Sequence, residues 1–180
     1  MFACHARAPR LFRDSQNANQ GQHDVQDVID RAIEMRTTMK HYFKDWWDDL
    51  ADDLFNDIER PSGDALFPVS YWFPNIVSPG LVCSHYTVLI LLNQLLIDSD
   101  HAESELLVAD SQRAAVEICK CAFQSQTRLL MSIYMPYWLQ VAADGCAPEH
   151  YVWIMSKLDH FRSAKDVGAA SGGSTPASDQ

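Results

Sequence analysis

Three carboxylates in the pattern Asp48-Asp49-Leu50-Ala51-Asp52 could together bind a magnesium ion that carries a diphosphate. Mg²⁺ prefers hard oxygen ligands such as carboxylates. For such a site the three carboxylates must lie on a helix that faces a cavity. Such chemistry would also need a second acidic motif on a facing helix and an Arg/Lys cluster for the diphosphate. Nothing after Asp110 resembles the second motif, so a solvated helix face is the simpler interpretation.

Cysteine side chains offer two further chemistries. Cys119 and Cys121 are two residues apart on a predicted helix, where they point to nearly opposite sides and cannot share one metal ion. Cys146 precedes His150 by one helical turn near a predicted helix N-terminus, which could lower the thiol pKa and supply a base. No third orienting group is identifiable, so we expect small buried thiols and a loop thiol. The sequence therefore predicts no cofactor and no metal site, and its unpaired cysteines indicate an intracellular protein.

His85 and Tyr86 form a polar pair inside an otherwise apolar segment. A buried polar group without a partner costs about 1–3 kcal/mol, so the pair requires partners. A satisfied core histidine is one interpretation, and the polar corner of a ligand pocket is the other. On the second interpretation we expect an effector pocket formed by His85, Tyr86, Trp72 and Trp138.

The element that must position this pair is a predicted central helix at about residues 79–97. Ser78 at the N-cap followed by Pro79 is a strong start signal for a helix. The following apolar residues run nearly all the way round, which is typical of a helix with neighbours on several faces. The stretch is marginal for a membrane span and carries His85, so a buried core helix is favoured. The predicted fold class is all-α, a helical bundle packed around this central apolar helix.

The preceding helix is predicted from Val25, where apolar residues recur three or four apart as far as Trp46. This pattern is nearly a heptad seam but lasts only about three heptads, so a bundle helix is favoured over a free coiled coil. We expect the helix to continue to Leu54. Residues 60–77 contain prolines and four aromatic residues, and we expect an ordered loop that wraps over the bundle.

Two further helices are predicted after the central one. Asp100 and Glu103 have the spacing of a capping box, which predicts a helix over about residues 101–134. Pro136 should stop or kink this helix. Pro148 then opens the last helix at its first position.

Length and charge limit the classes of function. The chain has 180 residues, enough for one domain with a real core. Its net charge of -10 argues against direct binding of this segment to DNA or RNA, and against binding to an anionic membrane surface. Residues 1–22 and 164–180 lack an apolar period, so we expect a disordered leader and a disordered tail around one helical domain at 23–163.

The central helix also resembles a known family. Residues 83–86 (CSHY) followed by 89–92 (LILL) resemble the "LH-x-x-YH-x-x-x-ILLHRP" helix in the regulatory (middle homology) domain of fungal Zn2Cys6 zinc-cluster transcription factors. Residues 43–50 (FKDWWDDL) resemble that family's "W-x-x-x-LP" segment, and 114–119 (AAVEIC) resemble its "A-A-x-x-I-C/L" helix. The resemblance covers about residues 25–162.

This resemblance implies a nuclear transcription regulator and no enzyme. Its regulatory domain would control a separate DNA-binding module, with the transcription machinery, a homo- or heterodimer partner and a small-molecule effector as its partners. Zinc would be held only by a six-cysteine cluster upstream, and the leader offers only Cys4. The resemblance therefore implies the carboxyl-terminal part of such a regulator, without its own DNA-binding module: a truncated paralogue, a fragmentary gene model or a cluster-less partner. Asn93-Gln94-Leu95 stands where the family often has His-Arg-Pro.

Two alternatives from other classes remain. One is a fragment of a magnesium-dependent isoprenoid enzyme, a terpene or prenyl enzyme, that uses Asp48, Asp49 and Asp52 in its DDxxD motif. The other is an inert helical dimerisation module that pairs through the apolar stripe between Val25 and Trp46.

Overall fold

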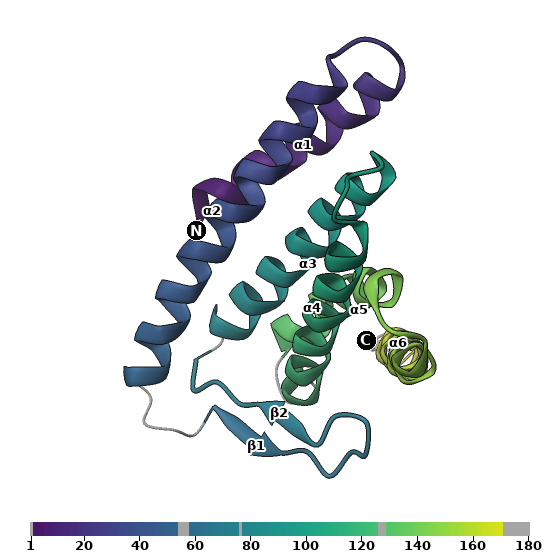
Figure 1. Ribbon diagram of the computed structural model, residues 1–180. Helices are drawn as coiled ribbons and strands as arrows, with labels where there is room; N and C mark the ends of the chain where they lie inside the picture. Colours follow the sequence, from purple (N-terminus) through teal and green to yellow (C-terminus); the bar gives the residue numbers. More distant parts are fainter. Residues whose placement is uncertain (1, 54–57, 76, 126–128, 171–180) are drawn as a thin grey trace, which may run out of the picture.

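Figure 1 shows the computed structural model of the chain, which describes residues 2–53, 58–75, 77–125 and 129–170. Within these ranges the helices are α1 (Phe2–Asn19), α2 (Val25–Asp53), α3 (Val77–Asp98), α4 (Ser104–Ser125), α5 (Leu129–Gly145) and α6 (Pro148–Ala170). Strands β1 (Glu59–Pro61) and β2 (Val69–Tyr71) form an antiparallel hairpin, with Arg60 opposite Ser70. The predicted all-α fold class is confirmed.

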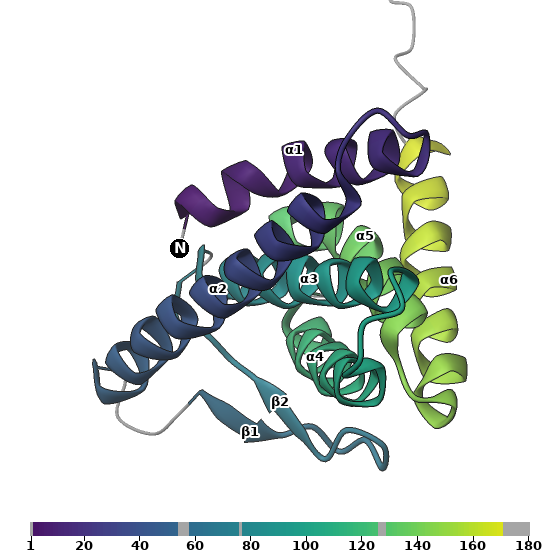
Figure 2. The same cartoon turned by 45° about the horizontal axis from the view of Figure 1, so that its top comes forward.

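α3 is the central helix of the bundle, and α2, α4 and α5 pack around it. Figure 2 shows α3 in the middle of the bundle, with α4 below it and α5 above it. Its buried side chains include Val82, Cys83, Ile90, Leu92 and Leu96, which point in several directions around the helix. By length and hydropathy alone α3 could cross a membrane, but 56% of that stretch is buried inside the bundle, as in a core helix.

α3 begins earlier than the sequence predicts. The Asn75 Oδ1 atom accepts the backbone N–H groups of Val77, at 3.0 Å, and Ser78, at 2.7 Å. This is the hydrogen bonding of an N-cap residue, so Asn75 and not Ser78 caps the helix. Pro79 lies within the first turn, where its missing N–H is tolerated.

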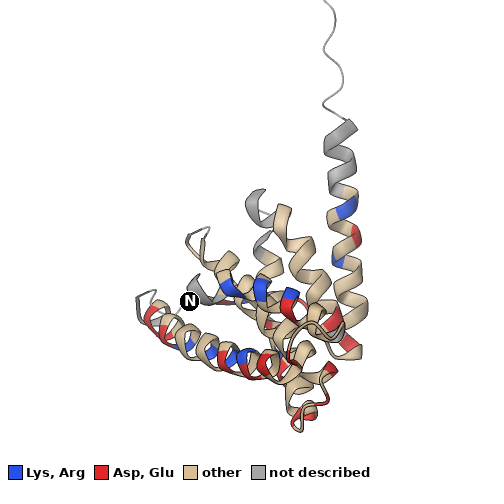
Figure 3. Ribbon diagram, turned by 90° about the horizontal axis from the view of Figure 1, so that it is seen from above, with Lys and Arg blue, Asp and Glu red and all other residues tan. Residues whose placement is uncertain are grey.

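α2 starts at Val25 as predicted, and Asp24 caps it by accepting the N–H of Gln26 at 2.9 Å. Charged residues of both signs follow one another along this helix (Figure 3). Val28, Ala32 and Met39 of the predicted seam are buried in an aliphatic cluster with leucines of α1, α3 and α4. This part of the seam is therefore used for packing inside the chain, while Val25 and Tyr42 of the same stripe are exposed.

The predicted disordered leader at residues 1–22 is wrong for residues 2–19, which form α1. Leu11 and Ala18 are buried in the aliphatic cluster and Ala8 is buried as well, and the small alanine side chains let α1 lie close to α2. At the other end, α6 continues to Ala170, so the predicted tail at 164–180 is helical at least in its first part. Residues 171–180 lie outside the described residues.

The predicted helix over residues 101–134 is also wrong, because α4 ends at Ser125 and α5 begins at Leu129. Pro136 does not stop a helix, since α5 continues through it to Gly145. The capping box is not formed either. Asp100 has a positive φ of 56°, and the N–H of Glu103 is accepted by His101 Nδ1 at 3.3 Å.

Residues 60–77 pack on the bundle as expected, but they contain a β-hairpin and not only a loop. Phe67, Tyr71 and Phe73 are buried, and β2 lies against α4. Asp64 ties the tip of the hairpin to α6, because its Oδ2 accepts Trp153 Nε1–H at 2.7 Å. Burial raises the pKa of Asp64, but this hydrogen bond and two from backbone N–H groups outweigh it and lower the pKa.

Candidate functional site

A hollow of about 520 Å³ lies where α2, β2, α3 and α4 meet. We call it the aromatic hollow. Its ring-bearing wall consists of Phe43, Trp47, Tyr71, His85 and Tyr86. The rest of the lining consists of Leu89, Ala114 and the charged side chains of Lys40, Lys44, Asp110, Arg113 and Glu117. The volume falls in the range of roughly 300–1,000 Å³ that small-molecule sites occupy.

The rings of the wall form one continuous set of contacts. Phe43 stacks flat on His85, with ring centroids 3.8 Å apart and planes 9° apart. Tyr86 meets Phe43 edge-on at 5.2 Å, and Trp47 packs on Tyr71 at 5.4 Å. These side chains come from α2, α3 and the hairpin, so the wall joins three elements that are separate in the sequence.

His85 is only 2% exposed, and its Nδ1 atom has no hydrogen-bond partner among the described residues. Burial lowers the pKa of His85 to about 3, and the charges of His5 and Lys40 act in the same direction. The ring is therefore neutral at physiological pH. His85 is therefore not a core histidine with all its hydrogen bonds satisfied.

The charged side of the aromatic hollow is centred on Asp110. Its carboxylate accepts hydrogen bonds from Arg36 and Lys40, both at 2.8 Å, and lies 3.4 Å from Arg113. Burial raises the pKa of Asp110, but the hydrogen bonds and positive charges around it outweigh burial and lower the pKa. The cations of this side are thus largely neutralised by one acid.

Asn93 of α3 is fully buried beside this carboxylate. Its Oδ1 accepts Arg36 Nε–H at 2.7 Å, and its Nδ2 donates to Ser111 Oγ at 3.1 Å and to the Leu107 carbonyl oxygen at 3.3 Å. A further bond to Asp110 Oδ2 measures 3.3 Å. The network joins α2, α3 and α4, so Asn93 holds in place the three helices that line the hollow.

Glu117 anchors the hairpin at the other end of the aromatic hollow. The Tyr71 hydroxyl donates to the Glu117 carboxylate, which also pairs with Lys120 at 2.9 Å. The Lys120 ammonium lies 5.0 Å from the centre of the Tyr71 ring, in a cation–π contact. Burial, together with the charge of Glu117, raises the pKa of Tyr71, so its hydroxyl stays protonated and remains a donor.

The structure brings together two of the four predicted pocket residues. His85 and Tyr86 line the aromatic hollow, but Trp72 and Trp138 do not. The Trp72 ring lies under Arg60 at 5.5 Å, and Trp138 lies on α5 beside Gly80, where an added Cβ would come within 3.8 Å of its ring.

Sequence reasoning missed Phe43, Trp47 and Tyr71 as wall residues. Phe43 and Trp47 are one helical turn apart, a spacing that places both side chains on the same face of α2. Tyr71 is the last residue of β2, and Trp72 follows it outside the strand, with its ring against Arg60. The spacing of Phe43 and Trp47 could have indicated that both side chains belong to one wall. The place of Tyr71 in that wall depends on how the hairpin packs and has no local signal in the sequence.

The carboxylates of the DDxxD pattern do not gather around a cavity where their side chains are described. Asp48 and Asp49 are exposed, and Asp48 pairs with Lys44 on the same helix. The side chain of Asp52 lies outside the part that the structure describes. Among the described residues there is no group of three or more His, Cys, Asp or Glu side chains that could hold a metal ion.

The cysteines behave as packing residues. Cys119 and Cys121 are both fully buried in α4, which is covered on several sides. The Cys146 thiol donates to the Ala143 carbonyl oxygen at 3.3 Å, and burial raises its pKa. A raised pKa reduces the thiolate fraction, so the geometry gives Cys146 no nucleophilic activation.

Comparisons with protein-family models, with curated proteins and with solved structures find no match to this chain.

Proposed function

We propose that this chain is the regulatory domain of a fungal transcription regulator of the zinc-cluster type. Its effector would be a small molecule bound in the aromatic hollow. One observation carries the effector site: His85 and Tyr86, which also carry the sequence resemblance, line a hollow of about 520 Å³. The DNA-binding module, the transcription machinery and the nuclear location come from the resemblance alone.

The chemistry of the wall favours a neutral, planar aromatic effector with hydrogen-bonding groups. Aromatic rings from three elements offer flat surfaces for stacking. The charged groups are already paired, since Lys40 and Arg113 contact Asp110. A ligand with a full charge would have to compete with these ion pairs, whereas a neutral ligand would leave them intact.

The arrangement also offers a route from binding to regulation. The hollow is lined by α2, α3, α4 and β2, so an occupant would contact all four and fix their relative positions. A ligand shifts a conformational equilibrium only by its difference in affinity for the two states. The contacts between elements, such as Tyr71 with Glu117, are the ones that such a shift would change.

A binding experiment with matched variants tests the effector site. The purified chain is titrated with a panel of neutral polycyclic phenols, and tryptophan fluorescence and the melting temperature are recorded. We expect saturable binding that Tyr86→Phe weakens about fivefold, because one hydrogen bond is lost. Tyr42→Phe is the control, since Tyr42 is an exposed tyrosine of α2 outside the hollow. No saturable binding, or equal losses in both variants, would contradict the site.

A reporter experiment tests the regulatory role separately. The chain is fused to an unrelated DNA-binding module, and transcription of a reporter is measured with and without a phenol that binds. We expect ligand-dependent output that Tyr86→Phe reduces and Tyr42→Phe preserves. Binding without any change in reporter output would show that the hollow is a ligand site but that the chain is not this kind of regulator.

A further inference from the structure

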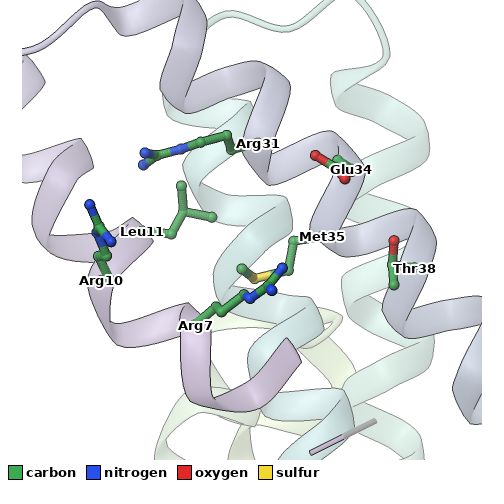
Figure 4. Close-up of a pocket in the computed structure, with 7 residues that line it drawn as sticks. All are labelled: Arg7, Arg10, Leu11, Arg31, Glu34, Met35 and Thr38. Carbon is green, nitrogen blue, oxygen red and sulfur yellow. The ribbon is translucent and has the colours of Figure 1, made fainter. Parts of the chain in front are cut away.

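A second hollow, of about 500 Å³, lies between α1 and α2 and shares no lining residue with the aromatic hollow. We call it the arginine groove. Arg7 and Arg10 of α1 and Arg31 of α2 line it, and Leu11 and Met35 supply its apolar surface. Figure 4 shows α1 and α2 on opposite sides of the groove, with Leu11 and Met35 between the arginine side chains.

The three arginines differ in how far their charges are already neutralised. Arg31 is paired, with Asp14 at 2.7 Å and Asp27 at 3.5 Å. Arg10 is only weakly paired, because its Nε lies 3.9 Å from Asp14 and its side chain is 83% exposed. Among the described residues Arg7 has no ion-pair partner within 4.0 Å. Two guanidinium groups of α1 therefore have free hydrogen-bonding capacity at the groove.

The positive charge of α1 contrasts with the negative net charge of the whole chain. The chain has a net charge of -10, yet α1 carries Arg7, Arg10 and Arg13 against the single acid Asp14. Like charges gathered on one face repel each other, and a bound anion relieves that repulsion. A guanidinium fork matches the two oxygens of a carboxylate or phosphate, which a single ammonium does not.

We propose that the arginine groove binds an amphiphilic oxyanion, a carboxylate or phosphate monoester joined to a short apolar chain. Arg7 and Arg10 hold the anionic head, and the apolar chain lies on Leu11 and Met35. Leu11 is 3% exposed and anchors the floor, while methionine side chains adapt readily to different apolar shapes. Glu34, also in the lining, would repel a second anionic group, so the ligand has one head.

Binding in the groove would also act on the position of α1. The groove has one wall on α1 and one on α2, so an occupant joins the two helices. α1 in turn brings His5 to the ring of His85, with centroids 6.5 Å apart. An anion in the arginine groove would therefore strengthen the docking of the helix that packs beside the aromatic hollow.

Calorimetric titration of the full chain tests the proposal with four probes, each kept below its micelle concentration. Octyl phosphate and octanoate represent the two head groups, and the tighter of them identifies the preferred oxyanion. Inorganic phosphate lacks the apolar chain, and octyl glucoside lacks the charge. We expect one saturable site for an octyl oxyanion, with at least about tenfold weaker binding for both of the other probes. Equal binding of all four, or none, would overturn the proposal.

Charge variants on α1 locate the site. Arg7→Gln combined with Arg10→Gln should weaken binding of the octyl oxyanion at least about tenfold, because both charge-assisted contacts are lost. Arg13→Gln is the matched control, since Arg13 is an exposed arginine of the same helix that does not line the groove. Circular dichroism of each variant verifies that α1 stays folded. Equal weakening by Arg13→Gln would show general charge attraction and no groove, and unchanged binding in the double variant would also refute the site.

Discussion

Two of the buried polar side chains of the central helix, Asn93 and His85, have neighbourhoods that are opposite in kind. Asn93 is fully buried and bonds through both of its amide atoms to side chains or backbone of α2 and α4. His85 is nearly as buried, but its Nδ1 has no hydrogen-bond partner among the described residues, and its ring is held by stacking on Phe43.

This difference separates buried polar groups that join helices from a buried polar atom that has no partner among the described residues. A fully satisfied buried network fixes the arrangement of the helices that it joins. A buried atom without a partner costs free energy in the folded protein, and such atoms are uncommon enough to require an explanation. Asn93 therefore acts as a structural link, while His85 lies at the wall where an effector is proposed.

The strongest test of this comparison is Asn93→Leu. The substitution leaves Arg36, Asp110 and Ser111 without their buried partner, so we expect the free energy of unfolding to fall by about 2–4 kcal/mol. Urea denaturation measures the change. Gln94→Leu is the control, because Gln94 is exposed and bonds only to Asp98 on its own helix. A loss below about 1 kcal/mol for Asn93→Leu would mean that the network is dispensable.

Acid should destabilise the protein through His85. Its pKa is about 3 in the folded state and about 6.5 when unfolded, so the unfolded state takes up the proton first. The neutral ring makes its full contribution to the free energy of unfolding above pH 6.5. This contribution decreases as the pH falls from 6.5 to 3. Between pH 6.5 and 5.5 we expect the free energy of unfolding to decrease by about 1 kcal/mol.

Comparison of the wild-type protein with His85→Leu isolates this contribution from the other histidines. Urea denaturation at pH 7.5, 6.5 and 5.5 gives the slope for each protein. The slope should be smaller in the variant than in the wild type. Identical slopes would show that His85 titrates normally in the folded protein.

The smallest effect is expected for His85→Leu at pH 7.5. The substitution loses ring stacking on Phe43, worth about 0.5–1.5 kcal/mol, but removes a buried atom without a partner, worth about 1–3 kcal/mol. The two contributions oppose each other, so the free energy of unfolding should fall by no more than about 0.5 kcal/mol. A loss as large as that of Asn93→Leu, measured by the same urea denaturation, would abolish the distinction between the two sites.

Several elements could be predicted because their signals are local. The central helix, the start of α2 at Val25 and the start of α6 at Pro148 follow from apolar periods and helix start signals. α1 escaped prediction because two of its buried positions are the alanines Ala8 and Ala18, which give little apolar period. These positions are buried because α2 and α3 lie over them, and no local pattern reports that.

Gly145 shows the same limit at a helix end. A glycine at a helix end often adopts a left-handed conformation, but the φ of Gly145, the last residue of α5, is not positive. A Cβ at this position would lie 2.8 Å from Ile90 Cγ2, so the glycine permits the close approach of α5 to α3. The residue is suited to both roles, and only the packing of the two helices identifies the second.

The sequence alone predicts α3, the starts of α2 and α6, and the presence of neighbours on several faces of α3, because these follow from short-range periodicity, helix start signals and hydropathy. It also singled out His85 and Tyr86 as polar residues in an apolar helix. Only the tertiary structure decided that Phe43, Trp47 and Tyr71 complete their wall, while Trp72 and Trp138 lie elsewhere. The reason is physical: a ring's partners depend on how α2, α3 and the hairpin pack, and those contacts join residues far apart in the chain.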